Sequence, residues 1–167
     1  NFGIIYGVSS FGLSNQTDLS RSESKDLIDL YFATYPKLQD YIQSQIEFAR
    51  ENGYVQTVLG RRRYLSDINA GNAVVRSAAE RNAVNAPIQG SAADIIKIAM
   101  INIHKALSQG NFQSKMLLQV HDELVFDVYK PELETMKQLI KTAMENAYPL
   151  KVPLVVDVGK GDNWLEA

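Results

Sequence analysis

The sequence predicts an α+β fold in which a short antiparallel sheet is backed by two long helices, with a separate helical subregion in the N-terminal third. Two observations lead to this fold class. Apolar residues recur at helical spacing before residue 53, from 91 to 109 and from 131 to 148. Two short apolar runs flank a polar triplet at 121–123, which is the pattern of a β-hairpin.

Composition limits the class of protein. The chain has 167 residues with 46% hydrophobic residues, enough for a domain with a real core. It has no cysteine, so disulfide and thiol chemistry are excluded. It shows no secretory signal pattern and no apolar run near the ~20 residues that a membrane span needs. A net charge of −2 argues against bulk attraction to nucleic acid but allows a local basic face. Because the chain starts at Asn1 without Met, we expect a fragment.

The first residues combine an apolar helical face with glycines. Phe2, Ile5 and Tyr6 suit one side of a helix, and Gly7 suits a helix C-cap. A frayed, glycine-rich terminus is the alternative.

A helical hairpin is predicted next. Ser20 and Glu23 form a capping-box pattern, Pro36 suits the first turn of a second helix, and Gly53 suits its end. The apolar stripe of these two helices is expected to form core.

The pattern of residues 54–65 predicts two strands, Tyr54–Val58 and Arg62–Leu65, joined by a turn. Arg61, Arg62 and Arg63 in and after that turn are the densest positive cluster of the chain. A solvated basic turn and a phosphate contact both remain open, since arginine matches phosphate oxygens well.

Residues 74–90 are helical in pattern, and Pro87 is expected to break or restart the helix. Arg81, Asn85 and Gln89 recur every four residues, and such side chains read base edges and sugars. An ordinary solvated helix face is the alternative. A new apolar helix is then expected to begin at Ser91 and to pack on the sheet.

Residues 117–128 place His121, Asp122 and Glu123 between two apolar strands that are expected to be buried. Two adjacent carboxylates on a hairpin suit Mg²⁺, although a polar turn explains the same residues. Strand alternation would place His121 and Glu123 on one face and Asp122 on the other.

In the C-terminal part, the sequence predicts a helix that begins at Pro131 and an edge strand at residues 152–158. Trp164 is expected to anchor the C-terminal tail on the core. Asp157 and Asp162 are expected at the surface.

Several motifs in order resemble family A DNA polymerases, the bacterial DNA polymerase I type. Residues 118–123 (LQVHDE) resemble motif C, and residues 1–7 (NFGIIYG) resemble the second half of motif B. The segments 53–55 and 60–64, 85–94 (NAPIQGSAAD) and 148–150 (YPL) also match in order, so the resemblance covers essentially the whole chain.

The resemblance implies part of a DNA-directed DNA polymerase of replication and repair, with primer–template DNA and dNTP as partners. It implies a palm-type sheet, a distal fingers region at about 1–75 and part of the palm at about 76–167. It implies a cytoplasmic, nucleoid-associated enzyme that does not act at a membrane.

The resemblance also implies residue roles. Asp122 would bind the two Mg²⁺ ions of phosphoryl transfer, and Glu123 would support that site. Phe2 and Tyr6 would contact the nucleotide and the templating position. The implied DNA contacts are Ser9, Arg81, Asn85, Gln89 and His121.

The second essential aspartate, the triphosphate-binding Arg and Lys, and the thumb would lie in the remainder of the polymerase, so this chain alone is expected to be inactive. Two alternatives remain: a metal-dependent nuclease or phosphohydrolase, and a non-catalytic nucleic-acid-binding module.

Overall fold

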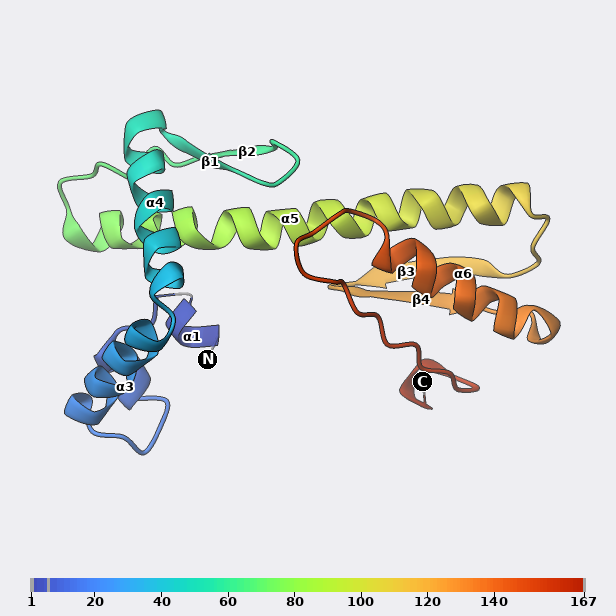
Figure 1. Ribbon diagram of the computed structural model, residues 1–167, viewed down its shortest axis with the longest axis horizontal. Helices are drawn as coiled ribbons and strands as arrows, with labels where there is room; N and C mark the ends of the chain where they lie inside the picture. The colour runs from blue at the N-terminus through green and yellow to red at the C-terminus, as the bar shows by residue number, and fades with distance from the viewer. Residues whose placement is uncertain (1, 6, 167) are drawn as a thin grey trace. The chain divides into compact units, whose positions relative to one another are not determined.

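The computed structural model describes residues 2–5 and 7–166, and at Phe2 it describes the backbone alone. Its helices and short antiparallel sheets confirm the predicted α+β class (Figure 1). The chain divides into two compact units, residues 1–91 and residues 92–167. No helix in the described part is both long and apolar enough to cross a membrane.

The first unit begins with two short helices, α1 (Phe2–Ile5) and α2 (Ser10–Ser14). After α1, Gly7 takes a positive φ of 80°, its N–H donates to the carbonyl of Ile4, and the N–H of Val8 donates to that of Gly3. This pair of hydrogen bonds is a Schellman motif, so the predicted glycine stop is confirmed.

The predicted helical hairpin is present as α3 (Arg21–Thr34) and α4 (Pro36–Asn52). Ser20 and Glu23 form both bonds of the capping box, Pro36 is in the first turn of α4, and Gly53 ends it in the left-handed conformation.

The expectation that the apolar stripe of α3 is core is wrong. Leu27 and Leu30 are 43% and 64% exposed, and Ser24 is the one buried residue of α3. Helical periodicity gives the direction in which a side chain points but not whether another element covers it.

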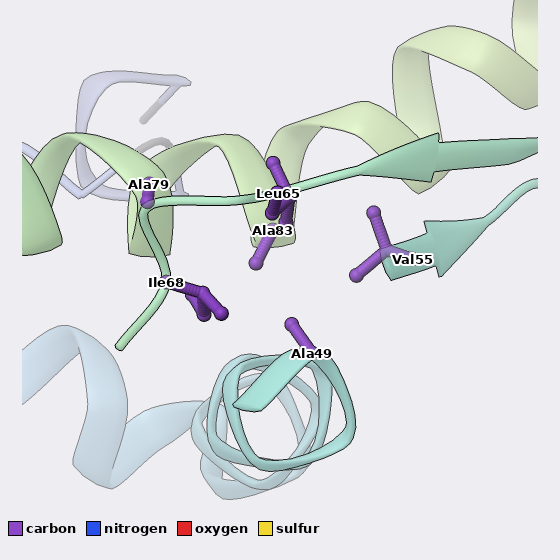
Figure 2. Close-up of a cluster of buried hydrophobic side chains, with 6 residues drawn as sticks. All are labelled: Ala49, Val55, Leu65, Ile68, Ala79 and Ala83. Carbon is purple, nitrogen blue, oxygen red and sulfur yellow. The ribbon is translucent and has the colours of Figure 1, made fainter. Parts of the chain in front are cut away.

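The hairpin β1 (Tyr54–Gln56) and β2 (Arg62–Tyr64) is antiparallel, with Val55 opposite Arg63. Its inner face contributes to the core of the first unit. Figure 2 shows that core, formed by α4, the hairpin and its continuation, and α5 (Ala73–Gln109); its buried members are Ala49, Val55, Leu65, Ile68, Ala79 and Ala83.

The predicted break at Pro87 is wrong, because α5 continues through it from Ala73 to Gln109. Proline in a helix interior costs about 3 kcal/mol. The cost is outweighed by packing on both sides, since Ala83 and Val84 before it and Ile96 and Ala99 after it are buried.

Ser91 is therefore not a helix N-cap. Its hydroxyl donates to the carbonyl of Pro87 and accepts from the N–H of Val58 at 2.9 Å, which ties the β1–β2 turn to α5.

In the second unit, the end of α5 packs with the hairpin β3 (Lys115–Val120) and β4 (Glu123–Asp127) and with α6 (Leu133–Glu145), which follows a 3₁₀ turn at Lys130–Glu132. The predicted helix after Pro131 and the predicted packing of α5 on the hairpin are confirmed. The centre of this core is formed by Ile103, Leu107, Met136 and Ile140.

Three expectations about the second unit are wrong. The strands around the acidic turn are not fully buried, since Leu117 and Leu118 are 58% and 43% exposed and β3–β4 is a two-stranded sheet. Residues 152–158 form no strand, because their backbone pairs with no strand of the described chain. Trp164 is 52% exposed in a 3₁₀ turn at Trp164–Glu166, so it does not anchor the tail.

Candidate functional site: an acidic hairpin turn and a polar helix stripe

The acidic triplet lies at the turn of the β3–β4 hairpin. Val120 pairs with Glu123, so His121 and Asp122 are the two residues of the turn itself. Strand alternation therefore does not by itself decide the faces of His121 and Asp122, because the chain reverses between them, and the predicted placement stays a prediction. His121 has a φ of 53°, which a non-glycine residue adopts at a cost of about 1 kcal/mol.

A side chain holds this turn. The amide Nε2 of Gln119 donates to the carbonyl oxygen of His121 at 2.8 Å. The bond restrains the peptide that leads into Asp122, so the backbone from which this carboxylate projects is held by the hairpin itself.

Asp122 and Glu123 are both exposed, and the carboxylate of neither forms a hydrogen bond or ion pair with the residues that the structure describes. Two adjacent carboxylates without a cationic neighbour are suitable donors for a hard divalent ion. Among the described residues, however, no group of three or more His, Asp or Glu side chains could hold a metal. The turn thus supplies part of a donor set.

The opposite end of the same hairpin is closed by Glu132. Its carboxylate accepts from the backbone N–H groups of Gln113 and Ser114, both at 3.0 Å, and from the Ser114 hydroxyl at 2.6 Å. Ser114 is buried and accepts from the N–H of Tyr129. The Ser114 side-chain bond and the backbone bonds lower the pKa of Glu132. The sequence pattern gave no signal for this network.

The predicted polar stripe lies on one continuous helix in the first unit. Because α5 is unbroken, Arg81, Asn85 and Gln89 do recur along one side of it. Arg81 donates to the hydroxyl of Ser77 at 3.0 Å. Asn85 is half-buried, its buried Oδ1 has no hydrogen-bond partner among the residues that the structure describes, and Gln89 is exposed.

The N-terminal segment reaches this stripe. A Cβ at Gly7 would lie 3.2 Å from Cγ of Arg81, so the backbone of Gly7 lies against the arginine stem. Ser9 is exposed and caps α2 by accepting from the N–H of Gly12. The side chain of Phe2 and the whole of Tyr6 lie outside the described residues.

A pocket of about 100 Å³ lies between the β1–β2 hairpin and α5. Arg61 closes one side by donating from Nη2 to the carbonyl of Gly90 at 3.1 Å. The methyl of Thr57 lies so close to Gly90 that a Cβ there would approach it to 2.7 Å. The lining residues are Val55, Gln56, Thr57, Arg61, Arg62, Arg63, Ala86, Gln89 and Gly90.

Comparisons with known proteins agree on one family. The model of DNA polymerase family A matches residues 1–166. The chain is 54% identical over its full length to a DNA polymerase I of Streptococcus pneumoniae and 49% identical, over 99% of its length, to that of Caldicellulosiruptor bescii. It spans 19% and 20% of these proteins, about a fifth.

A solved structure is also similar. It is titled the POL domain of Pol1 from M. smegmatis in complex with DNA primer-template and dNTP. The match has a TM-score of 0.95 at 50% identity and covers 98% of this chain and 29% of that one.

Proposed function

This chain belongs to DNA polymerase family A, and we propose that it is part of a DNA-directed DNA polymerase that adds dNTPs to a primer 3′-hydroxyl in replication and repair. The observation that supports this most directly is the pair of exposed carboxylates, Asp122 and Glu123, which form no ion pair with the described residues and lie at a hairpin turn held by Gln119. The solved relative's printed partners, primer-template DNA and dNTP, are the partners we propose here.

The family suggests dependence on divalent metal in general, and we propose two Mg²⁺ ions. Asp122 would bind them and Glu123 would support the site, with the second aspartate supplied by the remainder of the polymerase. Bound Mg²⁺ would lower the pKa of the primer hydroxyl and stabilise the charge that develops on the phosphate. Because the described residues hold only a partial donor set, this chain alone would not extend a primer.

The remaining side chains would position the substrates. His121 would lie near the primer terminus, Phe2 beside the nucleotide sugar, and Tyr6 with Ser9 at the templating position. Arg81, Asn85 and Gln89 would contact the minor groove, whose acceptors are shared by all correct base pairs, so they would test pairing without reading sequence.

We further propose that residues 1–75 belong to the distal fingers and 76–167 to the palm, a border close to the start of α5. By analogy with the bacterial relatives, the enzyme would act in the cytoplasm on the nucleoid.

The test is Asp122→Ala in the full-length polymerase that carries this sequence. Primer extension should fall by several orders of magnitude, whereas primer–template binding without Mg²⁺ should stay within about twofold, because the carboxylate acts through metal rather than on DNA. Asp127→Ala, an exposed aspartate at the other end of β4, is the matched control and should extend primers normally.

An Asp122→Ala enzyme with normal extension would refute the metal assignment. Labelled primer distinguishes the alternatives, since shortened products would indicate a nuclease, and binding without any product would indicate a binding module.

A further inference from the structure

We propose that Ser77 is a positioning residue for the polymerase reaction, because its hydroxyl holds the guanidinium of Arg81 in place before a substrate binds. The inference deepens the proposed function and rests on it, since it takes Arg81 as a contact with the minor groove. Ser77, Arg81 and the segment that packs on Arg81 all lie within the first unit.

The guanidinium of Arg81 is held by a bond within its own helix. Ser77 precedes Arg81 by four residues in α5, so the two side chains lie on the same face. Nη1 of Arg81 donates to Oγ of Ser77 at 3.0 Å. The guanidinium forms no other hydrogen bond and no ion pair with the residues that the structure describes. Since a guanidinium carries several N–H donors, Arg81 keeps most of them for a ligand.

The stem of Arg81 is held from a second side by the N-terminal segment. A Cβ at Gly7 would lie 3.2 Å from Cγ and 3.6 Å from Cδ of Arg81, so the glycine leaves the space that the stem fills. Gly7 also has a φ of 80°, a conformation that favours glycine over every other residue. The stem and the guanidinium of one exposed arginine are therefore held by different parts of the chain.

A long side chain that is ordered before binding loses less entropy when a ligand fixes it. Ordering one such side chain at an interface typically weakens binding by about two- to tenfold. No carboxylate of the described residues pairs with Arg81, so the Ser77 hydroxyl and the Gly7 backbone supply its order. Without that hydroxyl, the DNA itself would have to order the guanidinium, and part of this factor would be lost.

The expected effect concerns base pairing rather than the chemical step. Arg81 would contact minor-groove acceptors, which all correct base pairs present. A less ordered Arg81 would therefore weaken the binding of matched primer ends and would leave mismatched ends nearly unaffected. Ser77 itself would not touch the substrate, so its whole effect should pass through Arg81.

The test measures single-turnover primer extension by the full-length polymerase that carries this sequence, with matched and mismatched primer ends. For Ser77→Ala at matched ends, the concentration that gives half the maximal rate should rise about threefold, and the maximal rate should stay the same. Both values should be unchanged at mismatched ends. Because alanine is a better helix former than serine, a weakened α5 cannot explain the loss.

Three variants accompany Ser77→Ala. Ser77→Thr keeps the hydroxyl and should restore the values of the unsubstituted enzyme. Ser108→Ala removes an exposed hydroxyl of α5 that donates to the carbonyl of His104, and it should change neither value. Arg81→Ala removes the guanidinium, and adding Ser77→Ala to it should have no further effect, because the hydroxyl acts through Arg81.

The outcomes separate the two proposals. If the unsubstituted enzyme does not extend primers, the proposed function fails and the inference fails with it. If Arg81→Ala weakens matched ends and Ser77→Ala does not, only the positioning role of Ser77 is refuted. Equal losses from Ser77→Ala with and without Arg81 would also refute that role, because the hydroxyl would then act independently of the guanidinium. Normal use of matched ends by Arg81→Ala would overturn the minor-groove contact on which the inference rests.

Discussion

Replacing Gly90 with alanine should have two opposing effects on stability, a gain in helix propensity and a loss from steric overlap with Thr57. Gly90 lies inside α5, where alanine is favoured over glycine by about 1 kcal/mol. The added Cβ would lie 2.7 Å from Cγ2 of Thr57, and overpacking of this kind typically costs about 1–3 kcal/mol.

The methyl of Thr57 cannot easily move away. Thr57 is 8% exposed and β-branched, and its Oγ1 accepts from the N–H of Arg61. We therefore expect the hairpin to shift instead, with a net loss of up to about 2 kcal/mol in the free energy of opening the β1–β2 hairpin.

The assay is hydrogen exchange of the hairpin amides in the full-length polymerase, in a double-mutant cycle with Thr57→Ser. Serine keeps the hydroxyl and removes the methyl, so in the Thr57→Ser background Gly90→Ala should raise the free energy of opening the β1–β2 hairpin by about 1 kcal/mol. The coupling between the two positions should then be about 1–3 kcal/mol. If Gly90→Ala increases protection equally in both backgrounds, the close packing of Thr57 on α5 is not the deciding contact.

Two further predictions concern the second unit. The side chain of Met136 has no exposed surface, so Met136→Ala should lower the free energy of unfolding, measured by urea titration, by about 2–5 kcal/mol. The exposed control Thr135→Ala should change that free energy little. Equal effects of the two substitutions would contradict the assigned core. Because hydrogen bonds hold the pKa of Glu132 below its ordinary value of 4.5, its stabilising contribution should be complete above that value and should disappear as the pH falls through the lowered pKa. The difference in melting temperature between the unsubstituted enzyme and Glu132→Gln should therefore shrink below pH 4.5, and a difference independent of pH would refute the assignment.

Local signals in the sequence determined the ends of several elements. The capping box at Ser20 and Glu23, the proline at the start of α4 and the glycine at Gly53 each act through hydrogen bonds or dihedral preferences within a few residues. For the same reason the acidic turn was found, since apolar runs on both sides of a polar triplet indicate a hairpin without knowledge of its neighbours.

Tertiary packing decided what local signals could not. The sequence alone predicted that Pro87 would interrupt α5, and only burial of residues on both sides of it explains the unbroken helix and the single polar stripe that results. The exposure of Leu27 and Leu30, the missing strand at 152–158 and the pocket beside Arg63 depend on which elements meet. Periodicity fixes the face on which a side chain lies, whereas the surface that covers that face comes from residues far away in the chain.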